Sequence, residues 1–365
     1  MSYCCLSIWA AARFAVRAII PAPADLPPIS ILKPLKGTDP EMYESFRSHC
    51  LQDSHEYELL FGVSDASDPA VGLVEKLRKE FPDRAIRICI CDKKLGASGK
   101  VSVLAQLTKL AAHDIFLIND SDIRVKPDYL RTVISELQQP KAGLVTCLYR
   151  GIPAGTIFSK LESLGISTDF VPGVLVARQI EGGLKFGLGS TLAFRRADLE
   201  KIGGFEAIAD YLADDYELGK RISDSGMKIA LSRATVETFL PPYGLGDFFS
   251  HQLRWARTIR ASRPGGYAGL LVTYTLPWAL LNVLVARGAN WAWCILLGAF
   301  LLRVAVALIA GCSVLRDREV VRSLWLLPIR DLLAPVIWFA GLFGRGIVWR
   351  GEKFKLNNGK LTRIE

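Results

Sequence analysis

Short apolar stretches alternate with amphipathic stretches between residues 29 and 150. The apolar stretches have the length of buried strands, and the amphipathic ones repeat their apolar residues every three or four positions, as helices do. The pattern predicts strands at 29–35, 57–65, 84–91, 114–120 and 142–150, and helices at 38–50, 68–81, 100–112 and 127–137. Strands that alternate with helices predict an α/β fold, with a mostly parallel sheet covered by helices on both faces.

Three apolar segments follow in the C-terminal part of the chain. Residues 268–286 are uncharged, residues 288–315 carry only Arg303, and residues 332–344 form a third block. About 20 apolar residues cross the ~30 Å hydrocarbon core of a bilayer. Buried core helices of a soluble protein are the alternative, but three such segments in succession favour a multi-pass membrane protein.

The net charge of +9 is concentrated beside these apolar segments. Basic residues that flank membrane spans mark the cytoplasmic side and attract anionic headgroups. Because the arginines lie next to apolar segments, we do not expect a nucleic-acid partner. The eight cysteines include no CxxC pair, which favours reduced thiols over a zinc site or disulfides.

The N-terminal residues 1–28 are predicted to be a membrane-associated segment or shortened anchor, followed by the linker PAPADLPP. Arg13 and Arg17 interrupt the apolar run, and the part before Arg13 is too short to cross a bilayer. The basic residues also follow the apolar stretch, which disfavours a signal peptide.

Two carboxylates end one of the predicted strands. The stretch FLINDSDIRV places Asp120 and Asp122 two positions apart, where an open parallel sheet binds its ligands. Two such carboxylates raise each other's pKa unless a positive charge lies between them. Oxygen ligands without His or Cys suit Mg²⁺ or Mn²⁺, which accept substrate phosphates as further ligands. We therefore expect a divalent cation and a nucleoside diphosphate here; a solvated acidic turn is the alternative.

Two neighbouring strands also end in polar residues. Asp65 is expected to accept hydrogen bonds from a nucleotide, with an ordinary turn aspartate as the alternative. The loop KKLGASGK offers glycines for close backbone approach and Lys100 for phosphate contact. It is not a P-loop, because the GxxxxGK[ST] pattern is absent.

A second acidic pair, Asp214 and Asp215, precedes the amphipathic stretch of YLADDYELGKRISDSG. Either residue would serve as the N-cap of a helix. A carboxylate beside a metal-bound leaving group instead acts as a general base for an attacking hydroxyl. We expect Asp215 to be this base.

The stretch DFFSHQLRWARTIR predicts an amphipathic helix directly before the first apolar segment. At about 100° per residue, its residues divide into two sides. One side holds Phe248, Phe249, Leu253, Trp255 and Ile259; the other holds His251, Arg254 and Arg257. We expect the apolar side to lie in the membrane interface and the basic side to face a diphosphate.

Five motifs, taken in chain order, resemble the ceramide glucosyltransferase family, glycosyltransferase family 21. They are KPLKG (33–37), the aspartate of VSDASDP, the DSD triplet, ADDY (213–216) and HQLRW (251–255). The resemblance covers roughly residues 29–355, and bacterial members associated with hopanoid lipids look most similar. It implies a GT-A fold, a UDP-sugar donor, a divalent metal ion and inversion at the anomeric carbon.

The resemblance also implies roles for single residues. Asp120 and Asp122 become the metal-side pair and Asp215 the base. The expected donor-binding residues are Lys33, Pro34, Asp65, Lys100, Asp120, His251, Arg254 and Trp255. His251 stands where the family motif (Q/R)xxRW has Gln or Arg, which leaves its role open.

Together these features predict a membrane glycosyltransferase that transfers glucose or N-acetylglucosamine from a UDP-sugar to the hydroxyl of a lipid, such as ceramide or a hopanoid polyol. Three alternatives remain: a processive polysaccharide synthase, a catalytically silent lipid-binding scaffold, and a nucleotidyltransferase. The sequence does not distinguish the sugars, the acceptors or the oligomeric state.

The expected domain order is the N-terminal segment, a cytoplasmic catalytic domain at 29–246, an interfacial helix at 247–266, a transmembrane region at 267–349 and a basic tail at 350–365. Three full crossings would place this tail opposite the catalytic domain, against the positive-inside tendency. The prolines at 277, 328 and 335, with Arg330 and Asp331, favour a re-entrant or interfacial piece instead. We therefore expect a cytoplasmic tail.

Overall fold

The computed structural model describes residues 1–18, 20–21, 25–53, 56–349 and 352–363. It divides into two compact units. The helical unit comprises residues 1–18, 150–182 and 240–347, and the sheet unit comprises residues 19–149, 183–239 and 348–365. Residues 22–24 of the predicted linker and residues 350–351 and 364–365 of the predicted tail lie outside the described residues.

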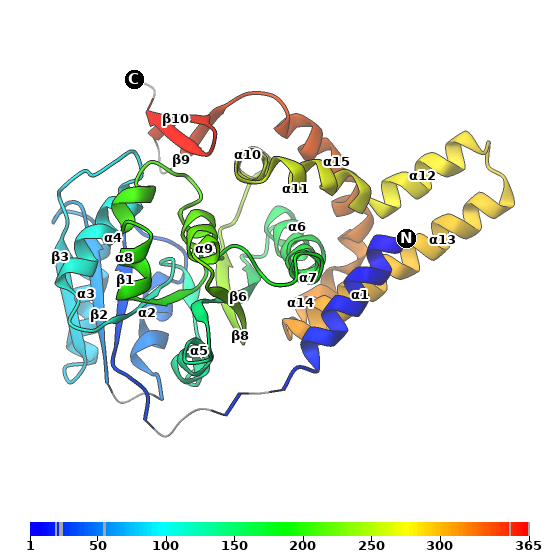
Figure 1. Cartoon of the computed structure of the whole chain (residues 1–365). Helices are drawn as coiled ribbons and strands as arrows, with labels where there is room; N and C mark the ends of the chain where they lie inside the picture. Colours follow the sequence, from blue (N-terminus) through cyan, green and yellow to red (C-terminus); the bar gives the residue numbers. More distant parts are fainter. Residues whose placement is uncertain (19, 22–24, 54–55, 350–351, 364–365) are drawn as a thin grey trace. The chain divides into compact units, whose positions relative to one another are not determined.

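An eight-stranded sheet, in the order β3-β2-β1-β4-β7-β6-β8-β5, forms the core of the sheet unit (Figure 1). One half is parallel, with β1 (Ile29–Pro34) between β2 (Tyr57–Val63) and β4 (Ile115–Ile118), and β3 (Ala85–Ile90) beyond β2. β2 and β4 are buried along their whole length, as expected for parallel strands whose two faces are covered. The four predicted strands of this half are confirmed.

The other half of the sheet contains antiparallel pairs. β7 (Leu192–Arg195) runs antiparallel to β4 and to β6 (Ala142–Pro153), and β5 (Ile123–Arg124) pairs antiparallel with β8 (Lys228–Leu240). The strand predicted at 142–150 is therefore present, but it lies in this antiparallel part. The sheet is mixed, with its parallel strands at the N-terminal end of the sequence.

The predicted helices of this region are present as α2 (Met42–Cys50), α3 (Ala70–Glu80), α4 (Gly99–Leu110) and α5 (Tyr129–Leu137). α4 packs against β1 and β2. Gly62 of β2 permits this close packing, because a Cβ there would lie 2.5 Å from a methyl carbon of Val103. Two helices and a 3-10 turn follow in the same unit: α8 (Arg196–Lys201), η2 (Phe205–Ile208) and α9 (Asp214–Asp224).

The described residues of the predicted basic tail, 352–363, are a folded part of the sheet unit. A three-stranded sheet is formed by β9 (Gly346–Trp349), β10 (Glu352–Asn357) and β11 (Lys360–Arg363). The backbone N–H of Leu361 donates to the carbonyl of Asp210 at 2.7 Å, and that of Leu212 donates to Gly359 at 3.1 Å. These bonds hold the tail against the segment that leads into α9.

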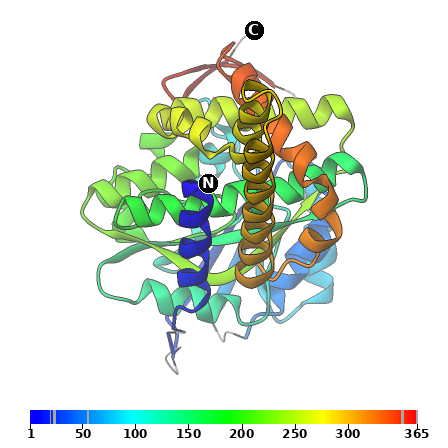
Figure 2. The same ribbon diagram turned by 90° about the vertical axis from the view of Figure 1, so that its right-hand side faces the viewer.

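The helical unit contains helices from three parts of the chain (Figure 2). They are α1 (Ser2–Ala15), α6 (Ile157–Gly165), η1 (Ile166–Phe170), α7 (Val171–Ile180), α10 (Leu245–Ser262), α11 (Pro264–Gly269), η3 (Leu270–Thr273), α12 (Thr275–Val285), α13 (Asn290–Ala307), η4 (Leu308–Val314), α14 (Glu319–Ser323), η5 (Leu324–Leu326) and α15 (Leu327–Gly341). The N-terminal α1 packs against α7, α13 and η4. Its 14 residues are too few to cross a bilayer as a helix.

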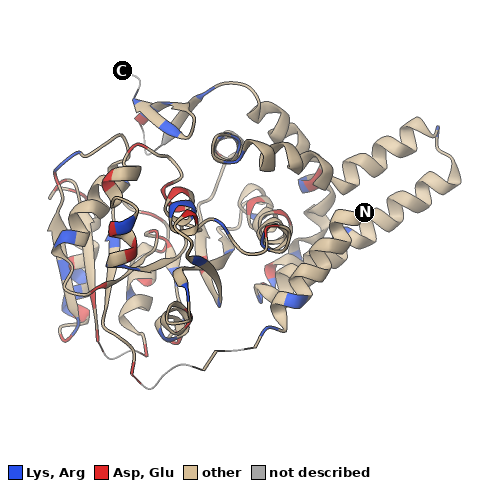
Figure 3. Ribbon diagram, in the orientation of Figure 1, with Lys and Arg blue, Asp and Glu red and all other residues tan. Residues whose placement is uncertain are grey.

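Two helical segments, Asn290–Val314 and Glu319–Gly341, are long and apolar enough to cross a membrane. A third segment, Pro264–Val285, qualifies only as a pair of helices bent by 52°. The second predicted span is thus close to the observed helix, whereas the first is broken and the third begins earlier than predicted. Figure 3 shows that α12 and α13 are almost free of charged residues. Several of their large apolar side chains are exposed, including Trp278, Trp291, Trp293 and Leu301.

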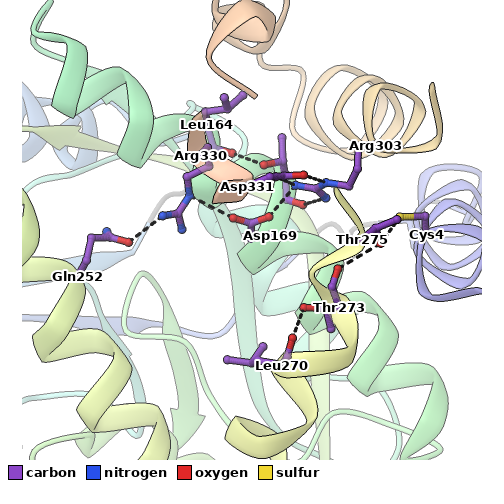
Figure 4. A network of polar contacts seen from close by, with 11 residues as sticks. Cys4, Leu164, Asp169, Gln252, Leu270, Thr273, Thr275, Arg303, Arg330 and Asp331 are labelled. Carbon is purple, nitrogen blue, oxygen red and sulfur yellow. Dashed lines mark hydrogen bonds and ion pairs between the residues drawn. The ribbon is translucent and has the colours of Figure 1, made fainter. Parts of the chain in front are cut away.

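A cluster of four charged side chains lies inside this apolar unit (Figure 4). The buried guanidinium of Arg303 donates to the two carboxylate oxygens of Asp331 at 2.7 and 2.6 Å and to Asp169 at 2.8 Å. Arg330 lies 3.1 Å from Asp169 and donates to Gln252 of α10 at 3.2 Å. Because a buried charge is costly unless it is paired, the two arginines and two aspartates stabilise one another and join α13, α15, η1 and α10.

We expect Arg303→Met to lower the free energy of unfolding by roughly 3–5 kcal/mol, because it leaves the Asp331 carboxylate buried without its partner. The double variant Arg303→Met, Asp331→Leu should recover part of this loss, since it removes both charges. Thermal unfolding of the detergent-solubilised protein measures both effects.

Arg322→Met is the matched control, because Arg322 pairs with Glu319 and 73% of its side chain is exposed. Such a surface pair is worth at most about 1 kcal/mol. Equal destabilisation by the Arg303 and Arg322 variants would contradict a stabilising role for the buried cluster.

Candidate functional site

Polar side chains from several elements meet at the carboxyl ends of the parallel strands in the sheet unit. Lys33, near the end of β1, donates to the backbone carbonyl of Asp120, which follows β4, at 3.3 Å. Asp68, after β2, accepts from the backbone N–H of Gly37 at 2.9 Å. Lys100 of α4 reaches the Asp120 carboxylate at 2.8 Å. The structure therefore brings together the KPLKG loop, the DSD loop and the lysine of KKLGASGK.

Lys100 lies between two carboxylates, with Nζ 2.8 Å from Asp120 and 3.2 Å from Asp214. Burial by itself would lower the pKa of Lys100, but Asp120, Asp214 and Asp215 raise that pKa above its ordinary value, so the side chain stays a cation. Asp214 is almost fully buried, whereas 45% of the Asp120 side chain is exposed. Asp120 is thus the carboxylate of this pair that a ligand can reach.

Asp215 lies in the first turn of α9. Neither it nor Asp214 caps the helix, whose N-cap is Ala213 without a side-chain hydrogen bond, so the capping alternative is wrong. The Asp215 carboxylate accepts from the backbone N–H of Gly189 at 2.7 Å and of Tyr216 at 2.8 Å. Burial and the charge of Asp214 raise the pKa of Asp215 to about 6, although the charge of Lys100 opposes the shift. A carboxylate with this pKa is ionised at neutral pH and is a stronger base than an ordinary aspartate.

A glycine separates the two acidic groups. A Cβ at Gly189 would lie 3.2 Å from a carboxylate oxygen of Asp120 and 3.2 Å from one of Asp215. The two carboxylates therefore approach the same backbone position, although they lie 95 positions apart in the sequence. This turn is fixed by Asn119, whose amide donates to the carbonyl of Ser190 at 2.7 Å.

Asp122 has different neighbours. The pairing of β5 with β8 places Ile123 opposite Thr238, and the Thr238 hydroxyl donates to the Asp122 carboxylate. Burial and the charge of Asp120 together raise the pKa of Asp122 to about 6. A positive ion beside these two carboxylates would lower that pKa.

The side chains near the DSD loop fit a divalent cation that is bound together with its substrate. Among the described residues, no set of three or more His, Cys, Asp or Glu side chains is arranged to hold a metal ion by itself. Mg²⁺ and similar ions need only one or two carboxylates when substrate phosphates supply further oxygen ligands. The reachable carboxylate of Asp120 is one such ligand, and a bound cation would lower the raised pKa of the neighbouring Asp122.

Three other predicted residues lie at the ends of β1 and β2. Lys33 is fully buried, and burial lowers its pKa to about 7 against the pull of Asp120 and Asp122. The hydrogen bond from Lys33 to the backbone carbonyl of Asp120 supports the DSD loop. Pro34 is the last residue of β1. The exposed Asp65 accepts from the backbone N–H and the hydroxyl of Ser67, both at 2.8 Å, and these bonds lower its pKa.

The HQLRW motif belongs to α10 of the helical unit. His251 Nδ1 lies 3.0 Å from a carboxylate oxygen of Glu162 on α6. The ring of Trp255 lies 5.8 Å from the ring of Phe170 in η1. Arg254 stands one turn after His251, on the same side of the helix. The motif is therefore supported by α6 and by the π-helix that follows it.

Two residues of α10 depart from the prediction. Phe248 was expected in the membrane interface but is fully buried in the core of the helical unit, with Leu161, Leu164 and Leu327. Arg257, expected to face a diphosphate, donates to the carbonyls of Phe343 and Gly346 at 3.2 and 2.7 Å. It binds the chain just after α15, where carbonyls have no helical partners.

Sequence reasoning missed the residues that support this site from distant segments. Glu162 lies in a stretch with no motif, and Thr238 lies in a strand whose partner the sequence did not indicate. The sequence indicated Gly189 only as one of several glycines in a predicted turn. Asn119 directly precedes the DSD triplet. This position in the sequence was the one feature that could have indicated its supporting role.

Sequence comparison places this chain near known proteins. The model of Glycosyl transferase family 21 matches residues 1–362. Ceramide glucosyltransferase 1 of Caenorhabditis elegans is 25% identical over 355 residues, which cover 93% of this chain and 73% of that protein. The ceramide glucosyltransferase of Komagataella phaffii is 32% identical over 117 residues, which cover 31% of this chain and 23% of that protein. The broader resemblance is confirmed, while these matches give no support to a bacterial hopanoid-associated subgroup.

Comparison of structures supports the predicted fold. The mannosyltransferase PcManGT from Pyrobaculum calidifontis, solved in complex with GDP-Man and Mn²⁺, is similar with a TM-score of 0.54. The two are 19% identical, and the match covers 92% of this chain and 95% of that one. At this identity the likeness shows the fold alone, and the GT-A prediction is confirmed.

We expect Gly189→Ala to lower turnover with a nucleotide-sugar donor about tenfold or more, because its Cβ would crowd both Asp120 and Asp215. Thermal unfolding should change little, since the turn keeps its backbone bonds. Gly72→Ala is the matched control, because a Cβ at Gly72 meets nothing within 4 Å. Full turnover by the Gly189 variant would contradict the shared position of the two carboxylates.

Proposed function

This chain belongs to glycosyl transferase family 21, and we propose on that basis that it transfers a sugar from a UDP-sugar to the hydroxyl of a membrane lipid, with inversion at the anomeric carbon. The observation that carries the proposal is that Asp120 meets Asp215 at Gly189 and pairs with Lys100. This arrangement offers a reachable carboxylate, a permanent cation and a basic carboxylate at the edge of one sheet.

Each residue has a part in the proposed reaction. Asp215 removes the proton from the attacking lipid hydroxyl, and its raised pKa suits this role. Lys100 stabilises the charge that develops on the departing diphosphate. Asp120 and Asp122 would hold Mg²⁺ or Mn²⁺, which supplies Lewis-acid stabilisation of the same leaving group when bound. Attack from the side opposite the diphosphate accounts for inversion.

Further donor contacts follow from the family resemblance. We propose that Asp65 binds the nucleotide, and that His251, Arg254 and Trp255 serve the donor or the acceptor. Lys33 is now proposed to act through the DSD loop, because its side chain is buried beneath Asp120. Pro34 sets the end of β1 beside it.

A lipid acceptor is favoured by the helical unit and by the named relatives, which are ceramide glucosyltransferases. Glucose and ceramide are therefore our first choices for the sugar and the acceptor. N-acetylglucosamine and a hopanoid polyol remain the second pair to test. The well-defined acidic group argues against a silent scaffold, and the few candidate spans argue against a polysaccharide channel.

We propose that the sheet unit and the tail both lie on the cytoplasmic side of the membrane. The tail is hydrogen-bonded to the sheet unit through Leu361 and Leu212, so the two must share one side. The chain between them therefore crosses the bilayer an even number of times. At most two of the three apolar segments cross fully, and four free cysteines in the sheet unit, Cys50, Cys89, Cys91 and Cys147, suit a reducing compartment.

The proposed reaction is tested by incubating the purified protein with Mg²⁺ or Mn²⁺, several UDP-sugars and a panel of membrane lipids, with products identified by mass spectrometry. We expect a glycolipid and free UDP. Asp215→Asn should reduce transfer by at least about a hundredfold, as expected for loss of a general base, while UDP binding persists. Wild-type activity should also decline below about pH 6, as Asp215 takes up a proton.

Asp224→Asn is the matched control, because Asp224 lies at the end of the same helix and pairs with Lys220 at the surface. It should transfer sugar at the wild-type rate. Turnover by the Asp215 variant equal to that of this control would remove Asp215 from its proposed role, and pyrophosphate as the product would favour a nucleotidyltransferase.

The topology is tested with a cysteine introduced at position 358 of the tail or position 83 of the sheet unit, in a background where Cys5, Cys294 and the partly exposed Cys312 are serine. An impermeant maleimide should label neither Asn358→Cys nor Asp83→Cys in intact cells and both after permeabilisation. Labelling of only one of the two in intact cells would contradict their placement on one side.

A further inference from the structure

The backbone segment that carries Gly189 is closed by the hydroxyl of one threonine. Thr146 of β6 is fully buried, and its Oγ1 accepts from the backbone N–H of Leu188 at 2.9 Å. The same oxygen lies 2.8 Å from the carbonyl oxygen of Thr191 and 3.2 Å from that of Leu188, and it has one proton to donate to them. The Thr146 hydroxyl therefore joins the two ends of the 188–191 turn.

Other buried side chains bind the remaining groups of this turn. Asn119 donates to the backbone carbonyl of Ser190 at 2.7 Å, and the hydroxyl of Thr191 lies 2.9 Å from that of Tyr129. The Ser190 hydroxyl donates to the backbone carbonyl of Cys147 at 2.9 Å. These partners belong to the end of β4, to α5 and to β6. The 188–191 turn is thus fixed by hydrogen bonds to three elements of the sheet unit.

The start of α9 packs on this segment. The backbone N–H of Gly189 donates to the Asp215 carboxylate at 2.7 Å. A Cβ at Gly187 would lie 2.8 Å from the backbone oxygen of Asp215, and a Cβ at Gly219 would lie 2.1 Å from the backbone nitrogen of Gly187. The orientation of the Asp215 carboxylate therefore depends on the position of the Gly189 N–H.

We propose that Thr146 is a positioning residue: by closing the 188–191 turn, its hydroxyl holds the N–H of Gly189 where it fixes the orientation of the Asp215 carboxylate. This inference rests on the proposed function, in which Asp215 is the general base. Thr146 itself touches no reacting atom, because its hydroxyl is buried among backbone groups. A base that is oriented in advance speeds the chemical step without changing the affinity for the nucleotide, so the effect falls on kcat.

A purely structural role for Thr146 predicts a different result, because any buried hydroxyl with similar bonds would then matter equally. Ser30 of β1 is also fully buried; its hydroxyl accepts from the backbone N–H of His113 at 3.2 Å and donates to Glu58 at 2.6 Å. It lies near the start of β1, at the edge of the sheet opposite the strand ends that carry the site. Ser30→Ala is therefore the matched control.

The experiment measures kcat and KM for transfer, affinity for UDP with Mn²⁺, thermal unfolding, and hydrogen exchange of the backbone amides in the turn. Thr146→Val keeps the shape of the side chain but leaves the N–H of Leu188 without its acceptor. Its kcat should fall about tenfold or more, while UDP affinity changes less than about twofold. The amides of the turn should exchange at least about tenfold faster.

The other variants separate positioning from stability. Thr146→Ser retains the hydroxyl and should keep kcat within about threefold of wild type. Ser30→Ala should lower the unfolding temperature, as Thr146→Val does, but keep wild-type kcat and wild-type exchange in the turn. In a Gly189→Ala background, Thr146→Val should lower kcat less than about threefold further, because both substitutions act through the same turn.

Four results would overturn the proposal: unchanged exchange in Thr146→Val, wild-type kcat despite faster exchange, a loss of UDP affinity as large as the loss of kcat, or an equal loss of kcat in Ser30→Ala. If Asp215→Asn loses turnover while Thr146→Val is normal, this inference fails alone. If Asp215→Asn retains full turnover, or if the wild type transfers no sugar, the proposed function fails and this inference fails with it.

Discussion

A single lysine ammonium among three carboxylates is the interaction on which the site depends. Without Lys100, Asp120 and the acidic pair at the start of α9 would repel one another in a partly buried space. The position of Lys100 follows from the start of α4, where Ser98 caps the helix. The backbone N–H of Ser98 in turn donates to the carbonyl of Ala209 at 2.8 Å. This hydrogen bond therefore joins the segment before Lys100 to the segment before Asp214 and Asp215.

In the helical unit, by contrast, charged side chains are buried in apolar surroundings. Arg303 and Asp331 occupy segments that qualify as membrane spans by length and composition. Their mutual pairing, with Asp169, removes most of the cost of placing them there. The same cluster reaches α10 through Arg330 and Gln252. Polar contacts inside the unit thus position the motif helix, while the exposed apolar side chains of α12 and α13 suit contact with lipid.

Much of the fold was predictable, because each strand of the parallel half is an apolar run with polar ends. The rule that ligands bind at the carboxyl ends of such strands singled out Asp120 and Lys100, and the structure brings their side chains together. The support from Gly189 and Thr238 was not predictable, since it depends on antiparallel pairings between distant segments. The third apolar segment was predicted to begin after residue 331, because Arg330 and Asp331 interrupt the apolar run. In the structure both side chains form ion pairs, and the helix continues through them.

The tail adds a constraint on the order of assembly. Its last strand is bonded to the backbone of residues 210–212, immediately before the acidic start of α9. Those residues are synthesised before any of the apolar segments, whereas their bonding partners are synthesised after all of them. The edge of the sheet unit that carries the acidic pair therefore reaches its final form only after the apolar segments have been made.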